Sequence, residues 1–183
     1  MRVALKEWDA VTRAALSGGV ALLIRKGGIL EQREGFSAEH TAFWLYPTFL
    51  HQNRAELRPQ FQNQLLEENP NPGEVRLEGY CTVEHVWKIE SLELARGLEQ
   101  FNALSSDAIE RRFLYKSKPW IHALLLRVYR CKPQTILETP TYSGCTSWVP
   151  LEEDVPVVNG VPTMNDLAFG ALKRELEAML GNS

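Results

Sequence analysis

The sequence EVRLEGYCTVE at residues 74–84 gives the clearest secondary-structure signal in the chain and decides the class of fold. Its apolar side chains follow a period of two, at Val75, Leu77, Cys81 and Val83, and mostly polar side chains lie between them. This period is typical of a strand with one buried face. We therefore expect a strand here that packs its apolar face on a core.

A turn before this strand, a glycine within it and a second apolar segment extend the prediction. The run NPNPG at residues 69–73 precedes the strand and is typical of a turn. Gly79 falls on the apolar face, where a missing side chain often marks a bulge or a barrel corner. Residues 122–131 are apolar on both faces and predict a second strand in a central position.

Shorter patterns extend this prediction in both directions along the chain. Further strands are expected at residues 20–25, 43–46, 135–137 and 146–149, and helical structure at 5–16, 49–67, 91–101, from 107, and from 163 to 179. Strands broken by helices indicate an α+β protein. We expect a small mixed, barrel-like sheet of five to six strands, with helices inserted between strands and a C-terminal helix.

The bulk composition is that of a globular protein. The chain has 183 residues, of which 44% are hydrophobic and 23% charged, and no linker or repeat divides it, so we expect a single domain over residues 1–183. The formal net charge is -3. This value argues against a protein that coats nucleic acid through overall positive charge, but it allows a local basic face.

Cysteine use and hydropathy indicate the compartment. Three widely spaced cysteines without a CxxC pair suggest neither a disulfide framework nor a zinc knuckle, so a reducing cytoplasm is expected. Lys6 and Glu7 interrupt any secretory signal, and no apolar run approaches the ~18 residues of a membrane span. We expect no membrane partner, no cofactor and no metal, and the sequence leaves the oligomeric state open.

The first candidate for function is a basic segment. From Arg111 to Lys132 there are seven Lys or Arg residues and no Asp or Glu, and aromatic residues lie among them. Basic and aromatic side chains together can pair with phosphates and stack on bases. The alternative is scattered, solvated surface charge. The residues predicted to bind nucleic acid are Arg25, Lys26, Tyr46, Arg111, Arg112, Lys116, Lys118, Trp120, Arg127 and Arg130.

The second candidate is a catalytic site in the loops between residues 25 and 51. Glu34, Glu39, His40 and His51 have side chains that bind metals or move protons. Their spacing matches no known metal motif such as HExxH. Hydrogen-bonded structural roles are therefore the stronger interpretation of these four residues.

Several motifs together resemble a known bacterial family, that of domain of unknown function 1802. The likeness extends over roughly residues 3–150 and rests on LIRKGGI at 23–29, LYPT at 45–48, HQ at 51–52, RVY at 127–129, GC at 144–145 and SWV at 147–149. Some members are reported beside restriction-type nuclease domains, which implies a role connected with DNA. The resemblance assigns no catalytic residue.

A weaker resemblance concerns the opening of the chain. Residues 15–18 and the strand after them are similar to the first helix and strand of PUA-like and ASCH barrels, which are small nucleic-acid-binding modules. The leading hypothesis is therefore a non-catalytic, nucleic-acid-associated module with a PUA-like barrel. The alternatives are a metal-dependent hydrolase or nuclease and a protein-interaction scaffold.

Overall fold

The computed structural model describes residues 1–26, 31–32, 35–36, 40–142, 144 and 146–181. Its main sheet has the strand order β2-β7-β6-β5-β1-β8, with β9 paired to β7 off this path. These strands are β1 (Val3–Trp8), β2 (Leu22–Arg25), β5 (Ala42–Thr48), β6 (Glu74–Ile89), β7 (Ile121–Leu137), β8 (Trp148–Pro150) and β9 (Val161–Pro162). The strands β3 (Glu31–Gln32) and β4 (Gly35–Phe36) pair with each other in a separate sheet.

Helices fill the connections and the C-terminal end. They are α1 (Asp9–Leu16), α2 (Leu92–Gly97), α3 (Ser106–Leu114) and α4 (Asp166–Leu180), together with the 3-10 turns η1 (Arg54–Glu56), η2 (Pro59–Gln64), η3 (Leu98–Phe101), η4 (Tyr115–Ser117) and η5 (Pro140–Tyr142). The α+β class, the mixed sheet and the C-terminal helix are confirmed. The main sheet contains seven strands, not five to six.

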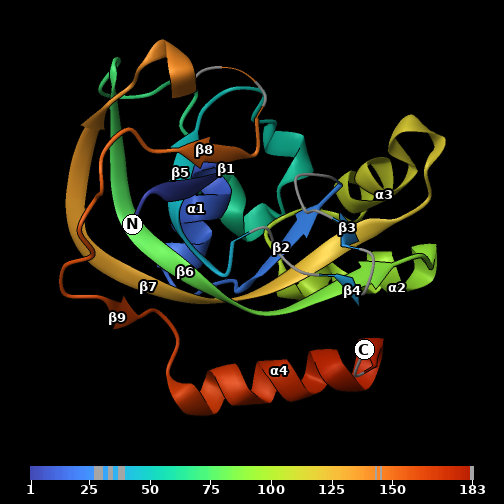
Figure 1. Ribbon diagram of the computed structural model, residues 1–183. Helices are drawn as coiled ribbons and strands as arrows, with labels where there is room; N and C mark the ends of the chain where they lie inside the picture. Colours follow the sequence, from blue (N-terminus) through green and yellow to red (C-terminus); the bar gives the residue numbers. More distant parts are fainter. Residues whose placement is uncertain (27–30, 33–34, 37–39, 143, 145, 182–183) are drawn as a thin grey trace.

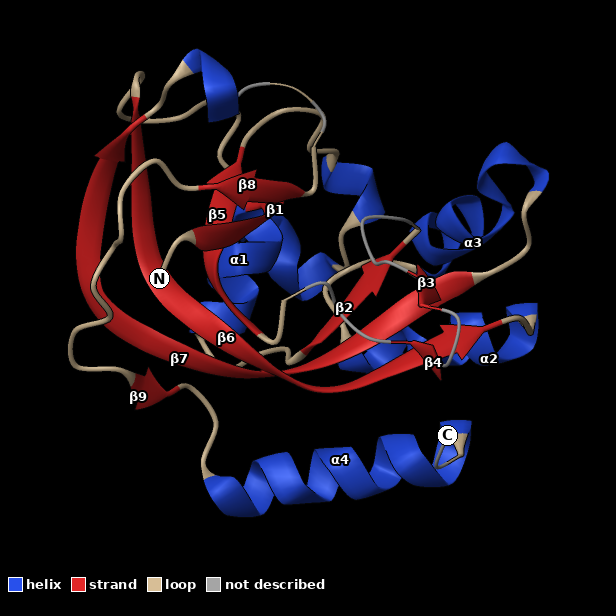
Figure 2. Cartoon of the chain, viewed as in Figure 1, coloured by secondary structure: helices blue, strands red, loops and turns tan. Residues whose placement is uncertain are grey.

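The antiparallel pair β6 and β7 forms the frame of the molecule. The two strands have 16 and 17 residues and pair along nearly their whole length, with register shifts at Leu77/Gly79 and Val83/His85. Such bulges bend a strand. The pair curves around α1, while α4 lies along its outer face (Figures 1 and 2). Helix packing on both faces explains why β7 is buried from Ile121 to Val128, as its two apolar faces predict.

The opening of the chain corrects one prediction. Residues 3–8 form β1, and the helix expected over residues 5–16 begins only at Asp9. β1 pairs in parallel with β5 and antiparallel with β8. Hydrogen bonds on both edges satisfy its backbone, and this tertiary pairing overrides the helical spacing of its apolar residues. Gly18, at φ 77, follows the helix in the left-handed conformation that glycine adopts without strain.

Other element boundaries also differ from the predictions. The helical structure expected over much of residues 49–67 forms only in part, as the short 3-10 helices η1 and η2. The strand expected over residues 43–46 runs through Pro47 to Thr48, and residues 135–137 belong to β7. Among the described helices, none is long and apolar enough to cross a membrane.

We predict that Gly79→Ala destabilises the fold. A Cβ on Gly79 would lie 2.3 Å from Leu16 Cδ2 and 2.6 Å from the carbonyl oxygen of Tyr129, so the Leu16 side chain and the β7 backbone would both have to shift. Overpacking of this kind lowers the free energy of unfolding by about 1–3 kcal/mol. Urea denaturation measures the change.

The matched control is Gly170→Ala in α4. Its Cβ would meet only the end of the Arg174 side chain, at 3.4 Å. Alanine is a better helix former than glycine, so this variant gains roughly 0.5–1 kcal/mol. If both variants change the free energy of unfolding equally, close packing at Gly79 is not important for the stability of the fold.

Candidate functional site

A basic cleft opens beside α3. Two adjoining cavities of about 460 and 200 Å³ share Arg25, Arg112 and Ser147 among their lining residues, and together they form this cleft. Its described lining also includes Lys6, Glu7, Trp8, Lys26, Thr48, Leu50, His51, Glu56, Ala108, Arg111, Tyr115, Gly144 and Thr146. Side chains from the start, the middle and the last third of the chain therefore meet at one place.

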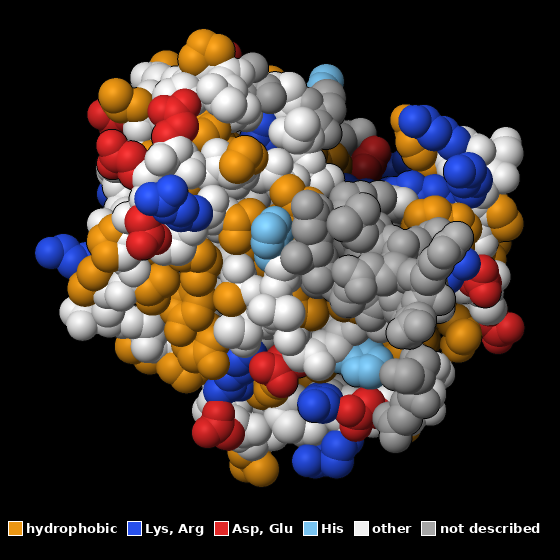
Figure 3. Space-filling view, in the orientation of Figure 1, with side chains coloured by type: hydrophobic (Ala, Val, Ile, Leu, Met, Phe, Trp, Pro, Cys, Tyr) orange, Lys and Arg blue, Asp and Glu red, His pale blue; other side chains and the backbone are white. Residues whose placement is uncertain are grey.

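The cleft is positively charged although the chain as a whole is acidic. Its described lining contains five Lys or Arg residues and two Glu residues, against a formal net charge of -3 for the chain. Figure 3 shows Lys and Arg side chains gathered over α3, on one wall of a hollow. Low-dielectric walls around such a concave basic surface concentrate its field and attract anions.

A buried ion pair fixes the floor of the cleft. Arg25 Nη1 lies 3.0 Å from Glu7 Oε2 and donates to the Lys6 carbonyl oxygen at 2.9 Å, and both charged side chains are largely buried. Arg112 Nη1 donates to the carbonyl oxygen of Ile24 at 3.0 Å, and its guanidinium lies over the Trp8 ring at 5.2 Å. Burial lowers the pKa of Arg112, and Glu7 partly offsets that effect.

Lys26 ties the loop after α3 to the cleft. Its Nζ donates to the carbonyl oxygens of Phe113 at 2.9 Å and Trp120 at 2.6 Å, and also to that of Lys118. The same Nζ lies 4.6 Å from the centre of the Trp120 ring. Burial and the charge of Lys118 lower the pKa of Lys26. Lys26 therefore holds the two ends of this loop together.

The loop itself is conformationally strained and exposed. Lys116 and Ser117 both have positive φ, at 57° and 56°, which non-glycine residues seldom adopt. Tyr115 is 56% exposed, and the side chains of Lys116 and Lys118 face solvent. Strained residues of this kind are concentrated at functional sites. The loop presents two cations and an aromatic ring beside the cleft.

The structure brings together only some of the residues predicted to bind nucleic acid. Arg25, Lys26, Arg111 and Arg112 line the cleft, and Lys116, Lys118 and Trp120 lie in the loop that Lys26 anchors. Arg111 also pairs with Glu56 at 3.3 Å.

Three predicted residues lie elsewhere. Tyr46 is 2% exposed and its hydroxyl faces Glu138. Arg127 pairs with Asp166 at the start of α4, and Arg130 donates to the Leu16 carbonyl oxygen at the end of α1. Arg127 and Arg130 belong to β7, and no described residue of that strand lines the cleft. Tyr46 does contact a lining residue, since Lys6 Nζ lies 5.3 Å from the centre of its ring, but its burial keeps it from a ligand in the cleft.

The four catalytic candidates do not form a described site. Glu34 and Glu39 lie outside the described residues. The His40 ring packs edge-on against Trp148 with centroids 5.0 Å apart, and His51, at φ 60, lines the cleft. Within the part of the chain that the structure describes, no three His, Cys, Asp or Glu side chains are placed to hold a metal.

Sequence reasoning missed Lys6, Glu7 and Glu56 as lining residues of the cleft. Lys6 and Glu7 lie in a segment predicted to be helical, in which charges are expected to face solvent. In the structure they are 8% and 5% exposed within β1. Two adjacent charges inside an apolar strand signal a buried site, but only once the strand is recognised.

Comparison with known proteins gives one family and a group of distant structural neighbours. The family model described as "Domain of unknown function (DUF1802)" matches residues 4–175. No curated protein matches the sequence.

The solved structures most similar to this chain include the ASCH protein from Zymomonas mobilis, at 18% identity and a TM-score of 0.43, covering 68% of this chain and 66% of that one. A point mutant of that protein has 16% identity and a TM-score of 0.44, covering 72% and 73%.

We predict that Lys26→Met loosens the loop after α3. The change leaves the carbonyl oxygens of Phe113, Lys118 and Trp120 without this donor, which costs about 1–3 kcal/mol of unfolding free energy. Lys118→Met removes an exposed ammonium instead and changes stability by no more than about 0.5 kcal/mol. Urea denaturation compares the two variants, and equal losses would refute the anchoring role of Lys26.

Proposed function

The chain belongs to the DUF1802 family, and we propose that it is a non-catalytic module that binds nucleic acid in the basic cleft. The observation that carries this proposal is the convergence of Arg25, Lys26, Arg111 and Arg112 on one concave surface in an acidic protein. Basic side chains that bind phosphates release counterions, and this release is the main source of affinity for nucleic acid.

The dimensions of the cleft favour a single strand. Cavities of 460 and 200 Å³ have the volume of small-molecule sites, so a phosphate and its neighbouring sugar or base can enter, while the side of a duplex cannot. Tyr115 adds an exposed ring at the edge. A basic groove beside an aromatic ring is the usual arrangement for binding single strands.

The cations of the cleft have two different roles in this proposal. Arg25 and Arg112 are held by Glu7 and the Ile24 carbonyl oxygen, so their positions are fixed before a ligand arrives. Lys116 and Lys118 are exposed and meet the phosphates as mobile charges. Fixed donors provide geometry, whereas exposed lysines mainly add salt-dependent attraction.

We expect fluorescence anisotropy to detect binding of labelled single-stranded DNA or RNA at low salt. The affinity should fall linearly on a log–log plot against salt concentration, with a slope of about 0.7 per phosphate contact. Duplexes of the same sequence should bind more weakly. The labelled strand should stay intact during incubation with Mg²⁺, and cleavage would contradict the non-catalytic part of the proposal.

A pair of matched double variants locates the site. Lys116→Glu with Lys118→Glu should weaken binding at least about tenfold and reduce the salt slope, because two phosphate contacts are lost. The control is Lys132→Glu with Arg174→Glu, at two exposed residues that lie neither in the cleft nor in the loop after α3 beside it. Both double variants change the net charge equally. Equal loss of affinity in the two proteins would show that binding does not occur at the cleft.

A further inference from the structure

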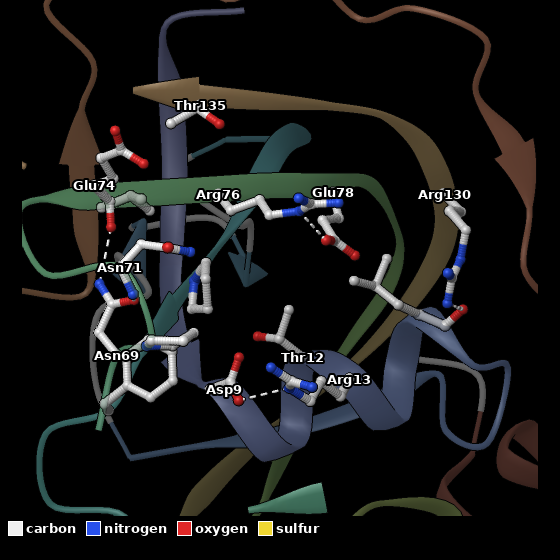
Figure 4. Close-up of a pocket in the computed structure, with 15 residues that line it drawn as sticks. Asp9, Thr12, Arg13, Asn69, Asn71, Glu74, Arg76, Glu78, Arg130 and Thr135 are labelled. Atoms are coloured by element: carbon white, nitrogen blue, oxygen red, sulfur yellow. Dashed lines mark hydrogen bonds and ion pairs between the residues drawn. The ribbon is translucent and has the colours of Figure 1, made fainter. Parts of the chain in front are cut away.

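A second cavity lies between α1 and the long strands β6 and β7. Its volume is about 510 Å³, and it shares no lining residue with the basic cleft. Figure 4 shows Asp9, Thr12 and Arg13 on α1 facing the strand that carries Arg76 and Glu78. We call this cavity the polar pocket.

The floor of the polar pocket contains two buried oxygen groups. Asp9 and Thr12 are each 5% exposed and lie almost one helical turn apart on α1. Arg13 Nε donates to Asp9 Oδ2 at 2.7 Å, and Oδ1 accepts no hydrogen bond from the described residues. Thr12 Oγ1 is buried and likewise has no hydrogen-bond partner within the described chain. Of these two oxygens, only Thr12 Oγ1 is fully buried without a partner. Such a buried polar group costs free energy, so it points to a missing ligand or water.

The electrostatic environment of Asp9 agrees with this geometry. Burial raises the pKa of the Asp9 carboxyl, Arg13 offsets part of that rise, and the charge of Glu78 adds to it. The carboxylate is therefore incompletely compensated by its own surroundings. A cationic group at Oδ1 would supply the missing compensation.

The rim of the pocket carries cations that can change partners. Arg76 is 59% exposed and pairs with Glu78, an exposed ion pair of the kind that contributes little to stability. Arg130 uses Nη2 to bind the Leu16 carbonyl oxygen, at 2.9 Å. Arginine can bind a carboxylate through two parallel hydrogen bonds. Arg76 can therefore bind an anionic group that enters above the floor.

The charges of the pocket are balanced, unlike those of the cleft. Asp9, Glu74 and Glu78 oppose Arg13, Arg76 and Arg130 among the described lining residues. A ligand of one sign would be repelled by half of these groups. A ligand with a positive group for the floor and a negative group for the rim would match both halves.

We propose that the polar pocket binds a small zwitterion of the α-amino acid class. The ammonium group binds Asp9 Oδ1 and Thr12 Oγ1, and the carboxylate binds Arg76 at the rim, because Arg130 is already engaged by the Leu16 carbonyl oxygen. This site is independent of nucleic-acid binding at the cleft, because the two sites have no lining residue in common.

Isothermal titration calorimetry of the full chain with each of the twenty L-amino acids, without nucleic acid, tests this proposal. At least one amino acid should bind with a dissociation constant of about 1 mM or tighter. Ethylammonium and propionate each carry only one of the two charges, and they should bind at least about tenfold more weakly. The proposal is wrong if no amino acid binds. It is also wrong if ethylammonium or propionate binds as tightly as the best amino acid.

Thr12→Val separates a binding role from a structural one. The substitution keeps the shape of the side chain but removes the hydroxyl, so the affinity for the amino acid should fall about tenfold or more. Because Thr12 Oγ1 has no partner within the described chain, the melting temperature without ligand should stay the same or rise. Unchanged affinity, or a lower melting temperature without ligand, would overturn the assignment.

Arg76→Gln tests the rim, with Arg174→Gln on α4 as the control of equal charge. The first variant should weaken amino-acid binding and leave nucleic-acid binding as it was, since Arg76 does not line the cleft. The control should change neither. Loss of both activities in Arg76→Gln, or equal amino-acid binding in the two variants, would contradict a separate zwitterion site.

Discussion

The close approach of α1 to the bent strand β6 is the constraint on which the other parts of the structure depend. Gly79 has no side chain at the point where Leu16 and the Tyr129 carbonyl oxygen come nearest. The register shift beside it bends β6 around the helix. Since β7 pairs with β6 over nearly its whole length, both long strands take the same curve, and α1 fills the inside of that curve (Figure 1).

This constraint produces two cavities of opposite character. At the cleft, β1 and β2 bring Glu7 and Arg25 into a buried ion pair, around which other cations gather. Between α1 and β6, Asp9 instead faces a pocket in which acidic and basic side chains are balanced. A buried pair is costly unless its partners are held in place. Both sites therefore rely on the rigid sheet for their geometry.

Local patterns were enough to predict the central elements and part of the cleft. The period of two at residues 74–84, the bulge at Gly79 and the apolar faces of residues 122–131 correspond to β6 and β7. The composition of the 111–132 segment also identified Arg111 and Arg112. The helical spacing of residues 5–16 predicted a helix where Val3–Trp8 forms a strand. Pairing with β5 and β8 stabilises that segment more than a helical turn would.

The sequence by itself determined the α+β class, the two long strands and a basic segment in an acidic chain, because these depend on local periodicity and composition. Only the tertiary structure decided which charges meet. Arg25 and Arg112 are 87 residues apart in the sequence, yet both line one cleft. Arg127 and Arg130 are much nearer to Arg112 in the sequence, but they contact α4 and α1 instead. Sheet pairing and strand alternation set these positions, and neither is encoded within a short window of sequence.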